Sequence, residues 1–265
     1  MGMTNQTYPT DFTDSQWDLI KDEIPAAKPG GRQRTVDMRQ VVNAILYVDN
    51  NGIKWRALPH DYPKWQTVYW YFARWRDDGT WQRIHDTLRA RLRQQAGRHK
   101  QPTAGCLDSQ SVKTTELGGE RGFDSGKQVK GRKRHILVDT LGLLLVVVVT
   151  AASVQDRDGA QTLFGRLTGA CKKLRRIWVD GGYRGPKLAA WVSQHLHRLS
   201  LQVVLRPEER KGFVLLPRRW VVERTLAWLN QYRRLSKDYE RLTASSEAMI
   251  YIPMTRIMVR RLAAA

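Results

Sequence analysis

Apolar residues recur at helical spacing over the first hundred positions, whereas short β-branched runs dominate the rest of the chain. In the first part this pattern predicts four helices, over residues 15–24, 37–49, from near 63 to 75, and 80–93. Asp14 is a suitable N-cap for the first helix, and Asn51-Gly52 closes the second. Six of the ten tryptophans lie here and supply an aromatic core. We therefore expect a small all-α region before a β-rich one.

The second part alternates strands and helices. Strands are predicted over 105–113, 133–139, 143–151, 176–180 and 201–205, and helices over 156–171, 186–197 and 221–238. Thr140-Leu141-Gly142 joins the second and third strands as a hairpin. The order βββαβαβα, an antiparallel hairpin beside a parallel βαβ part, is that of the ribonuclease-H-like α/β fold. The polar segment 94–105 suits a linker, so we predict two domains, residues 1–100 and 101–265.

The charge of the chain narrows the class of protein. Its 265 residues include 45 Lys and Arg against 25 Asp and Glu, a formal net charge of +20. Residues 1–100 hold 16 basic and 11 acidic side chains, so +15 of the excess lies in the second part. This charge in a globular composition indicates a polyanionic partner, DNA or RNA, rather than a merely soluble basic protein.

The sequence does not indicate a secreted, membrane-spanning, disulfide-rich or zinc-binding protein. The polar N-terminus, residues 1–10, has no apolar run of the secretory kind. The longest apolar stretch, 141–150, is about half of the roughly 20 residues that a membrane helix needs. With only Cys106 and Cys171, neither a disulfide framework nor a cysteine zinc site is supported. We expect a cytoplasmic protein with no membrane partner.

The N-terminal part, with its tight turn, basic residues and aromatic core, is similar to a helix-turn-helix module, in which one helix enters the major groove of DNA. Its candidate DNA contacts are Lys54, Arg56, Lys64, Gln66, Tyr69, Arg74 and Arg76. A plain helical bundle with solvated charges is an equal alternative at this point.

Three acidic residues lie at positions where a ribonuclease-H-like fold brings together the carboxyl ends of its central strands. Asp108 lies on the first strand, Asp180 ends the fourth, and Glu223 opens the last helix. Two Mg²⁺ ions can clamp the attacking and leaving oxygens of a phosphodiester, and Mg²⁺ prefers oxygen ligands. Without metal, clustered carboxylates raise one another's pKa. Taken singly, each residue has a structural alternative: strand capping, an Asp-Gly turn, or compensation of the helix dipole.

Residues near the triad have other expected roles. Asp156 and Asp158 are predicted to cap a helix or support the triad, Asp139 to belong to the hairpin, and His135 to pack on the sheet or contact phosphate. Gly181-Gly182 allow a close approach to Asp180, and no P-loop is present, so no nucleotide cofactor is implied. A concentrated basic run favours phosphate binding and comprises Lys127, Lys130, Arg132, Lys133 and Arg134.

Five ordered strings resemble the DDE transposases of bacterial insertion sequences, in the group named for insertion sequence five and related to the insertion-sequence-four transposases. They cover the second part nearly end to end: residues 107–113 (LDSQSVK), 126–140 (GKQVKGRKRHILVDT), 153–160 (SVQDRDGA), 179–185 (VDGGYRG) and 218–240 (RRWVVERTLAWLNQYRRLSKDYE). Trp55-Arg56-Ala57-Leu58-Pro59 also looks like the N-terminal region of that family.

The resemblance implies that Asp108, Asp180 and Glu223 are the catalytic ligands of two Mg²⁺ ions, for which Mn²⁺ substitutes. The last motif of the family is Tyr, two residues, Arg, three residues, Glu, six residues, Lys. Arg219 and Glu223 keep this spacing, whereas Leu216 and Asn230 replace the Tyr and the Lys. Separations of 72 and 43 residues between the acids leave no room for an inserted β-domain. The remaining implied DNA contacts are Tyr183, Arg184, Arg219, Asn230, Arg233, Arg234 and Lys237.

The resulting hypothesis is a transposase that binds the terminal inverted repeats of its element through the N-terminal helices, cleaves the transposon ends and joins the 3′ hydroxyl to target DNA. Two ends must be joined, so we expect a homodimer or larger assembly on double-stranded DNA, at the nucleoid of a bacterium. One rival is a metal-dependent nuclease of the same fold without strand transfer. The other is a non-catalytic DNA-binding regulator or decayed element, against which the intact triad argues.

Overall fold

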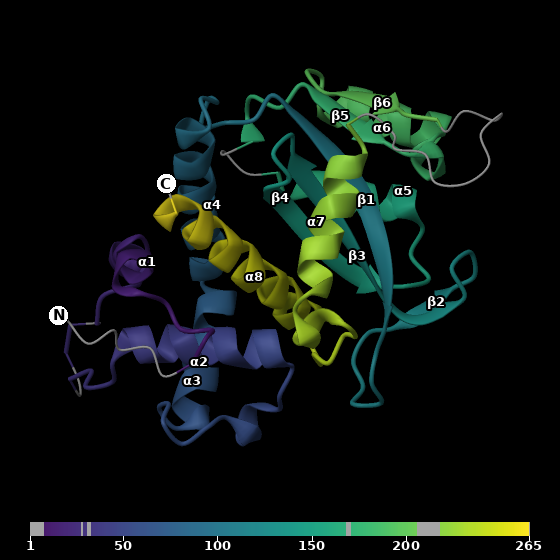
Figure 1. The fold of residues 1–265 in the computed structure, drawn as a ribbon. Helices are drawn as coiled ribbons and strands as arrows, with labels where there is room; N and C mark the ends of the chain where they lie inside the picture. The colour runs from purple at the N-terminus through teal and green to yellow at the C-terminus, as the bar shows by residue number, and fades with distance from the viewer. Residues whose placement is uncertain (1–7, 28, 31–32, 168–170, 206–217, 265) are drawn as a thin grey trace.

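A computed structural model describes residues 8–27, 29–30, 33–167, 171–205 and 218–264. Its N-terminal part is helical, as expected (Figure 1): α1 (Asp14–Asp18), α2 (Met38–Asn51), α3 (Trp65–Asp77) and α4 (Thr80–Gln95), with short 3₁₀ turns η1 (Lys21–Glu23) and η2 (Trp55–Ala57). Thr13 rather than Asp14 caps α1, through a capping box with Gln16. Asp37 caps α2, and Gly52 ends it in the left-handed conformation, at φ 69°.

The described residues of the second part form a six-stranded sheet: β1 (Ala104–Lys113), β2 (Gly122–Asp124), β3 (Val129–Asp139), β4 (Leu144–Ala151), β5 (Arg176–Val179) and β6 (Ser200–Val203). The strand order is β2-β3-β1-β5-β6, with β4 also paired to β3. The β1–β3 and β3–β4 pairs are antiparallel, whereas β1–β5 and β5–β6 are parallel. This confirms the ribonuclease-H-like arrangement; β2 is an addition that the sequence pattern did not reveal.

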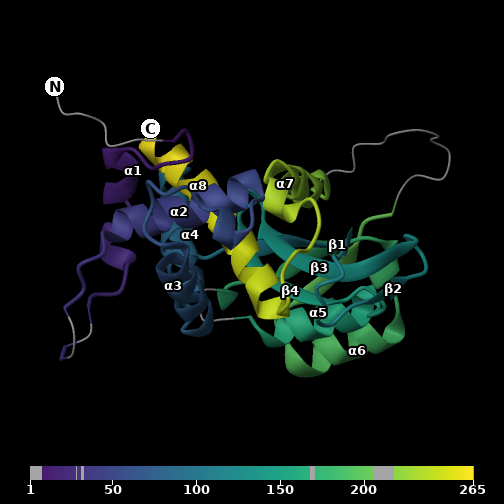
Figure 2. The same cartoon turned by 90° about the horizontal axis from the view of Figure 1, so that it is seen from below.

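Helices cover both faces of the sheet. Figure 2 shows α7 (Trp220–Asn230) on one face and α5 (Asp156–Gly165) with α6 (Pro186–His195) on the other. Alternate strand residues enter two separate apolar clusters: Cys106, Ile136 and Trp178 face the side of α7, while Leu107, Leu137 and Ile177 face α5 and α6. The sheet therefore supplies two cores, and its central strands carry apolar side chains on both faces.

The expected last helix differs from the observed one. A helix over 221–238 was predicted, but α7 ends at Asn230, and a 3₁₀ turn η5 (Arg233–Leu235) follows. Asp238 then lies beside Thr114 in an isolated parallel bridge, and its N–H donates to the Lys113 carbonyl at 2.8 Å. The segment after the helix thus adds a contact at the end of β1. The predicted helix 156–171 likewise ends early, at Gly165.

A further long helix, α8 (Thr243–Ala263), was not predicted. It runs between the N-terminal helices and the sheet (Figure 1) and contacts α1 to α4 as well as β4 and α7. Its buried Met249, Ile252 and Met258 belong to one apolar cluster that also contains residues of α2, α4, β3 and β4. The boundary near residue 100 falls in the loop after α4. The two predicted domains thus share a core through α8.

None of the helices in the described part of the chain combines the length and the apolar character needed to span a bilayer.

Gly159 of α5 lies directly on the ring of His135, which is fully buried on β3. A Cβ at position 159 would stand 2.1 Å from His135 Cε1, so the helix would have to move off the sheet. We expect Gly159→Ala to lower the free energy of unfolding by about 1–3 kcal/mol through overpacking. Gly165→Ala in the same helix is the control, because its Cβ would meet nothing within 4 Å. Urea unfolding of both variants tests this; equal stabilities would contradict the packing.

Candidate active site

The register of the parallel strands brings two of the predicted acids together. Cys106 of β1 is paired with Trp178 of β5, so the same register two residues on sets Asp108 beside Asp180. Asp180 follows the last residue of β5, and its Oδ1 accepts the Gly182 N–H at 2.9 Å. Asp108 Oδ1 accepts the N–H of Ser109 at 2.7 Å. Each carboxylate is thus fixed by a backbone N–H through one oxygen, which leaves Oδ2 available.

Helix α7 brings the third acid over the same strands. The start of the helix is anchored on β1 and β5, because Cys106 Sγ donates to the Arg218 carbonyl at 3.0 Å and the Arg218 guanidinium stacks on the Trp178 ring at 4.7 Å. Thr225 Oγ1 donates to the Gly142 carbonyl at 2.8 Å, which fixes the helix to the β3–β4 hairpin. Glu223, in the first turn of α7, lies near Asp180 at the end of β5, since both are within 4 Å of the same Arg219 nitrogen.

The three acids meet at one atom. Nη2 of Arg219 lies 3.2 Å from Asp108 Oδ2, 3.8 Å from Asp180 Oδ2 and 3.7 Å from Glu223 Oε1. The exposure of the three acidic side chains rises from 15% for Asp108 to 35% for Asp180 and 44% for Glu223, so the group opens to solvent on one side. The structure thus brings together all three predicted acids, with a predicted DNA contact at their centre.

The chemistry of this group suits a divalent cation. Three carboxylate oxygens surround one positive charge, and hard cations such as Mg²⁺ take oxygen ligands. Burial raises the pKa of the Asp108 carboxyl, with a further contribution from Asp180, while the Ser109 N–H and Arg219 act in the opposite direction. As they stand, however, no three His, Cys, Asp or Glu side chains among the described residues are arranged to hold a metal ion. The donor set fits, and the carboxylates would have to close around the ion.

A polar network lies on the opposite face of β1, behind the triad. Ser109 Oγ donates to Asp156 Oδ1 at 2.7 Å, and Lys133 Nζ lies 3.2 Å from both Asp156 Oδ1 and Asp124 Oδ2. Lys127 Nζ donates to the Ser109 carbonyl at 3.0 Å. Asp156 is the first residue of α5 but does not cap the helix, because the N-cap is Gln155. Of the two roles predicted for Asp156, the structure therefore shows support of the triad, through its hydrogen bond to the strand that carries Asp108.

Asp124 is the most strongly held carboxylate of this network. It accepts the Ser111 hydroxyl at 2.6 Å and the N–H groups of Gly126 and Lys127, each at 3.1 Å. Burial opposes the charged form, yet the bonds from Ser111, Lys127 and Lys133 prevail and lower the pKa of Asp124 to about 2.

We expect Asp124→Asn to lower the free energy of unfolding by about 2 kcal/mol at neutral pH. A depressed pKa stabilises the fold above the unfolded value of about 3.9, and this contribution disappears as the pH falls toward 2. The difference between wild type and variant should therefore shrink between about pH 4 and 2. Urea unfolding at several pH values measures it, and a difference that is constant with pH would contradict the assignment.

Tyr183 also lies behind the triad and is buried, at 2% exposure. Burial raises the pKa of its phenol well above the usual value, and the nearby Asp108, Asp156 and Asp180 raise it further. The prediction that Tyr183 contacts DNA is wrong in this structure, because the residue is part of the core under α6.

Four of the basic residues predicted to bind DNA are instead buried and form hydrogen bonds and ion pairs within the fold. Arg132 and Arg134 are 0% and 1% exposed, and their guanidinium groups donate to carbonyls between Leu235 and Arg241. Lys133 is held by Asp124 and Asp156, and Arg234 joins Glu240 to the Ile53 carbonyl. These predictions are wrong because Arg132, Lys133 and Arg134 lie on the covered part of β3 and Arg234 lies in the buried turn η5. Arg76, 11% exposed, is similarly occupied by Asp77 and Ser245.

The other predicted contacts lie at least partly on the surface. Arg74 is half-buried and stacks on Trp70 at 5.0 Å, and exposed Arg56 lies over Trp65 at 5.5 Å. Asn230 accepts a bond from Gln110 at 3.2 Å. Leu216 falls outside the described residues. The remaining exposed candidates are Lys54, Lys64, Gln66, Tyr69, Lys127, Lys130, Arg184, Arg233 and Lys237. Their DNA contacts stay predictions.

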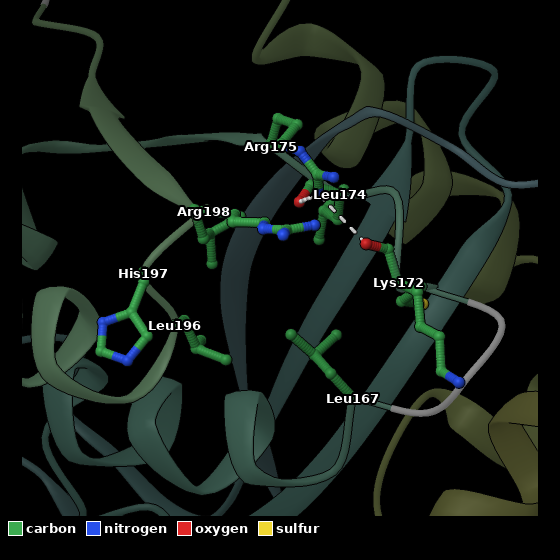
Figure 3. A pocket seen from close by; sticks show the side chains of 9 residues that line it. Leu167, Lys172, Leu174, Arg175, Leu196, His197 and Arg198 are labelled. Carbon is green, nitrogen blue, oxygen red and sulfur yellow. Dashed lines mark hydrogen bonds between the residues drawn. The ribbon is translucent and has the colours of Figure 1, made fainter.

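A separate cavity of about 340 Å³ lies near the beginning of β5 (Figure 3). Asp180 follows the other end of this strand. Leu167, Leu174 and Leu196 line it together with Lys172, Arg175 and Arg198. It shares no residue with the triad or with the network behind it.

The predictions from sequence omitted Ser109 and Asp124, and they did not place Arg219 among the three acids. Ser109 and Ser111 lie two residues apart on β1 and therefore on the same face of the sheet, and Ser111 is paired with Lys133 of β3. This strand periodicity was the signal from which the polar network could have been predicted. For Arg219 the signal was its spacing of four residues from Glu223, which sets the two on one helix face. His135 packs on the sheet and Asp139 lies in the hairpin, as predicted.

Comparisons with known proteins agree with this geometry. Residues 99–258 match the family model described as "Transposase DDE domain", and residues 12–85 match "Putative transposase of IS4/5 family". The chain is similar to the "Putative transposase for insertion sequence element IS402" of Burkholderia cepacia, 31% identical over 124 residues, 42% of this chain and 54% of that protein. It is also similar to the "Insertion element IS402 uncharacterized 16.2 kDa protein" of the same organism, 30% identical over 115 residues, 41% of this chain and 77% of that protein.

This chain thus spans about half the length of the first of these relatives. The matches to the two family models follow one another along the chain and take in α1 to the beginning of α4 and then the sheet with α7. Since the DDE-domain match alone covers more than half of the residues, the chain belongs to the DDE transposases, of the IS4/5 type.

Proposed function

We propose that the protein is a metal-dependent transposase that binds the terminal inverted repeats of an insertion sequence, cleaves the ends of the element and joins the 3′ hydroxyl to target DNA. The observation that carries this proposal is the meeting of Asp108, Asp180 and Glu223 at one solvent-accessible point over the central strands β1 and β5. Family membership supports it, because both matched models are described as transposases.

The three acids would hold two divalent ions, Mg²⁺ or Mn²⁺, which when bound activate the attacking oxygen and neutralise charge that develops on the phosphate. Contacts within the chain fix the positions of these three acidic side chains. Backbone N–H groups hold the two aspartates from behind, and the anchored start of α7 holds Glu223. The same site can serve water during cleavage and a 3′ hydroxyl during joining, since both are oxygen nucleophiles.

The exposed basic residues would hold the DNA. Lys127 donates to the carbonyl of Ser109, next to Asp108, and Arg184 is exposed four residues after Asp180. In the N-terminal part, η2 and α3 expose Arg56, Gln66 and Tyr69 for contact with the inverted repeat. Joining two ends requires at least two copies of the chain on double-stranded DNA. Such a protein would work at the bacterial nucleoid.

The test uses linear DNA that carries the ends of the element from which the gene comes, a supercoiled target and Mg²⁺. We expect nicks at the ends and, from ends supplied precut with a 3′ hydroxyl, products joined to the target. EDTA should abolish both. A nuclease of the same fold would cut without joining precut ends, and a DNA-binding regulator would shift the DNA in gels without changing it, so either result would overturn the proposal.

A further inference from the structure

One guanidinium nitrogen occupies the point where the three acids meet. Nη2 of Arg219 is the only described basic atom within 4 Å of each of Asp108 Oδ2, Asp180 Oδ2 and Glu223 Oε1. The oxygens that face it are those not used by the N–H groups of Ser109 and Gly182. The Oδ2 atoms of both aspartates are therefore turned toward one positive charge.

This arrangement places an organic cation where the proposed metal ions would stand. The distances of 3.2 to 3.8 Å are those of an ion pair and exceed the roughly 2.1 Å of a Mg²⁺–oxygen bond. Nη2 and a metal ion cannot share the space between these oxygens, because both are positively charged and the carboxylates must close in around the metal.

The arginine is held only loosely at this position. Of its three acidic neighbours, Asp108 alone lies at hydrogen-bond distance, and the buried Nε has no hydrogen-bond partner among the described residues. An unpaired buried donor raises the free energy of this placement. Arg219 is the N-cap residue of α7, so its side chain can swing away without a change in the helix.

We propose that Arg219 is an internal counter-ion that competes with divalent metal for the triad, and that metal enters when the guanidinium leaves. The proposal rests on the proposed function, since it assigns the triad to metal. A phosphate of bound DNA is the natural acceptor for the displaced guanidinium, because arginine forms charge-assisted bonds with phosphate oxygens. Metal binding and DNA binding then strengthen each other through one side chain.

The experiment measures Mn²⁺ binding to the full chain without DNA, from the electron paramagnetic resonance signal of free Mn²⁺. Arg219→Gln should bind Mn²⁺ at least about tenfold more tightly than wild type, since a unit positive charge in contact with the ligands is removed. Arg198→Gln is the matched control: it deletes the same charge from an exposed residue at the far cavity and should bind as wild type does. Asp180→Asn combined with Arg219→Gln should lose the gain.

A second readout tests the coupling to DNA. Adding end DNA should tighten Mn²⁺ binding by wild type severalfold, and should do so much less for Arg219→Gln. Arg219→Lys keeps a positive charge, so its affinity for Mn²⁺ should stay close to that of wild type. It also shows whether a substitution at this position by itself prevents folding. Thermal unfolding without metal verifies the fold of each variant.

Unchanged or weaker Mn²⁺ binding by Arg219→Gln would overturn the inference, because Arg219 would then position the carboxylates for metal rather than exclude it. Failure of every variant to bind Mn²⁺ would overturn it as well. The first result leaves the proposed function standing, whereas the second would also count against a triad that holds metal. End cleavage and joining by the wild-type chain are judged separately by their own assay.

Discussion

Asp180→Asn is expected to lower the rates of end cleavage and of strand joining by about a thousandfold or more. Asparagine has the size of aspartate, and its side-chain oxygen can still accept the Gly182 N–H. What it loses is the charge of Oδ2, one of the three oxygens at the metal position. Both reactions should fall together, because a single site serves both.

Folding and DNA binding should survive this change. Asp180 is 35% exposed and repels the two other acids, so its neutralisation should shift the free energy of unfolding by no more than about 0.5 kcal/mol. Asp22→Asn, the same substitution at an exposed residue of η1, is the control and should keep wild-type rates. Normal joining of precut ends by Asp180→Asn, with Mg²⁺ present, would remove Asp180 from the site.

Arg132→Met is expected to destabilise the fold by about 3–5 kcal/mol, the largest stability loss that we predict. Its guanidinium, on β3, donates to Asp238 at 3.1 Å, to Ser246 at 3.0 Å and to the carbonyls of Glu120, Glu240 and Arg241 at 2.7 to 2.8 Å. Methionine fills part of the volume but leaves Asp238 buried without its ion pair. Urea unfolding and thermal melting measure the loss.

Lys130→Gln separates this structural role from DNA binding. Lys130 lies two residues earlier on the same strand and is exposed. Its replacement should leave stability within about 0.5 kcal/mol and weaken binding of all DNA sequences alike, as the loss of a phosphate contact does. If Arg132→Met melted at the wild-type temperature and lost only DNA affinity, the structural role assigned to Arg132 would be wrong.

The strands were predictable because their signals are local. Runs such as Leu144 to Ala151 are apolar on both faces, as a strand between two helical layers must be. The acids follow from topology: once Asp108 and Asp180 lie on neighbouring parallel strands, the register brings them together. The order of elements therefore predicts that these two carboxylates lie close together.

The fate of the basic run could not be predicted in the same way. Lys130 and Arg132 are two residues apart and equally charged, yet one is exposed and the other fully buried. The difference depends on partners more than a hundred positions away, Asp238 and Ser246, which only the tertiary fold brings near. Helix α8 was missed for a related reason, since Pro253 interrupts its helical signal and its packing surfaces belong to both halves of the chain.

The position of α8 has a consequence for how the protein is made. Thr243 follows all the strands in the sequence, so α8 leaves the ribosome after the helices and the sheet that it joins. Until then Ile84, Leu88 and their neighbours on α4 lack the apolar surface that covers them. The N-terminal helices should accordingly stay open to chaperones and proteases during synthesis, and a nascent chain stalled before α8 should be degraded rather than released as a DNA-binding fragment.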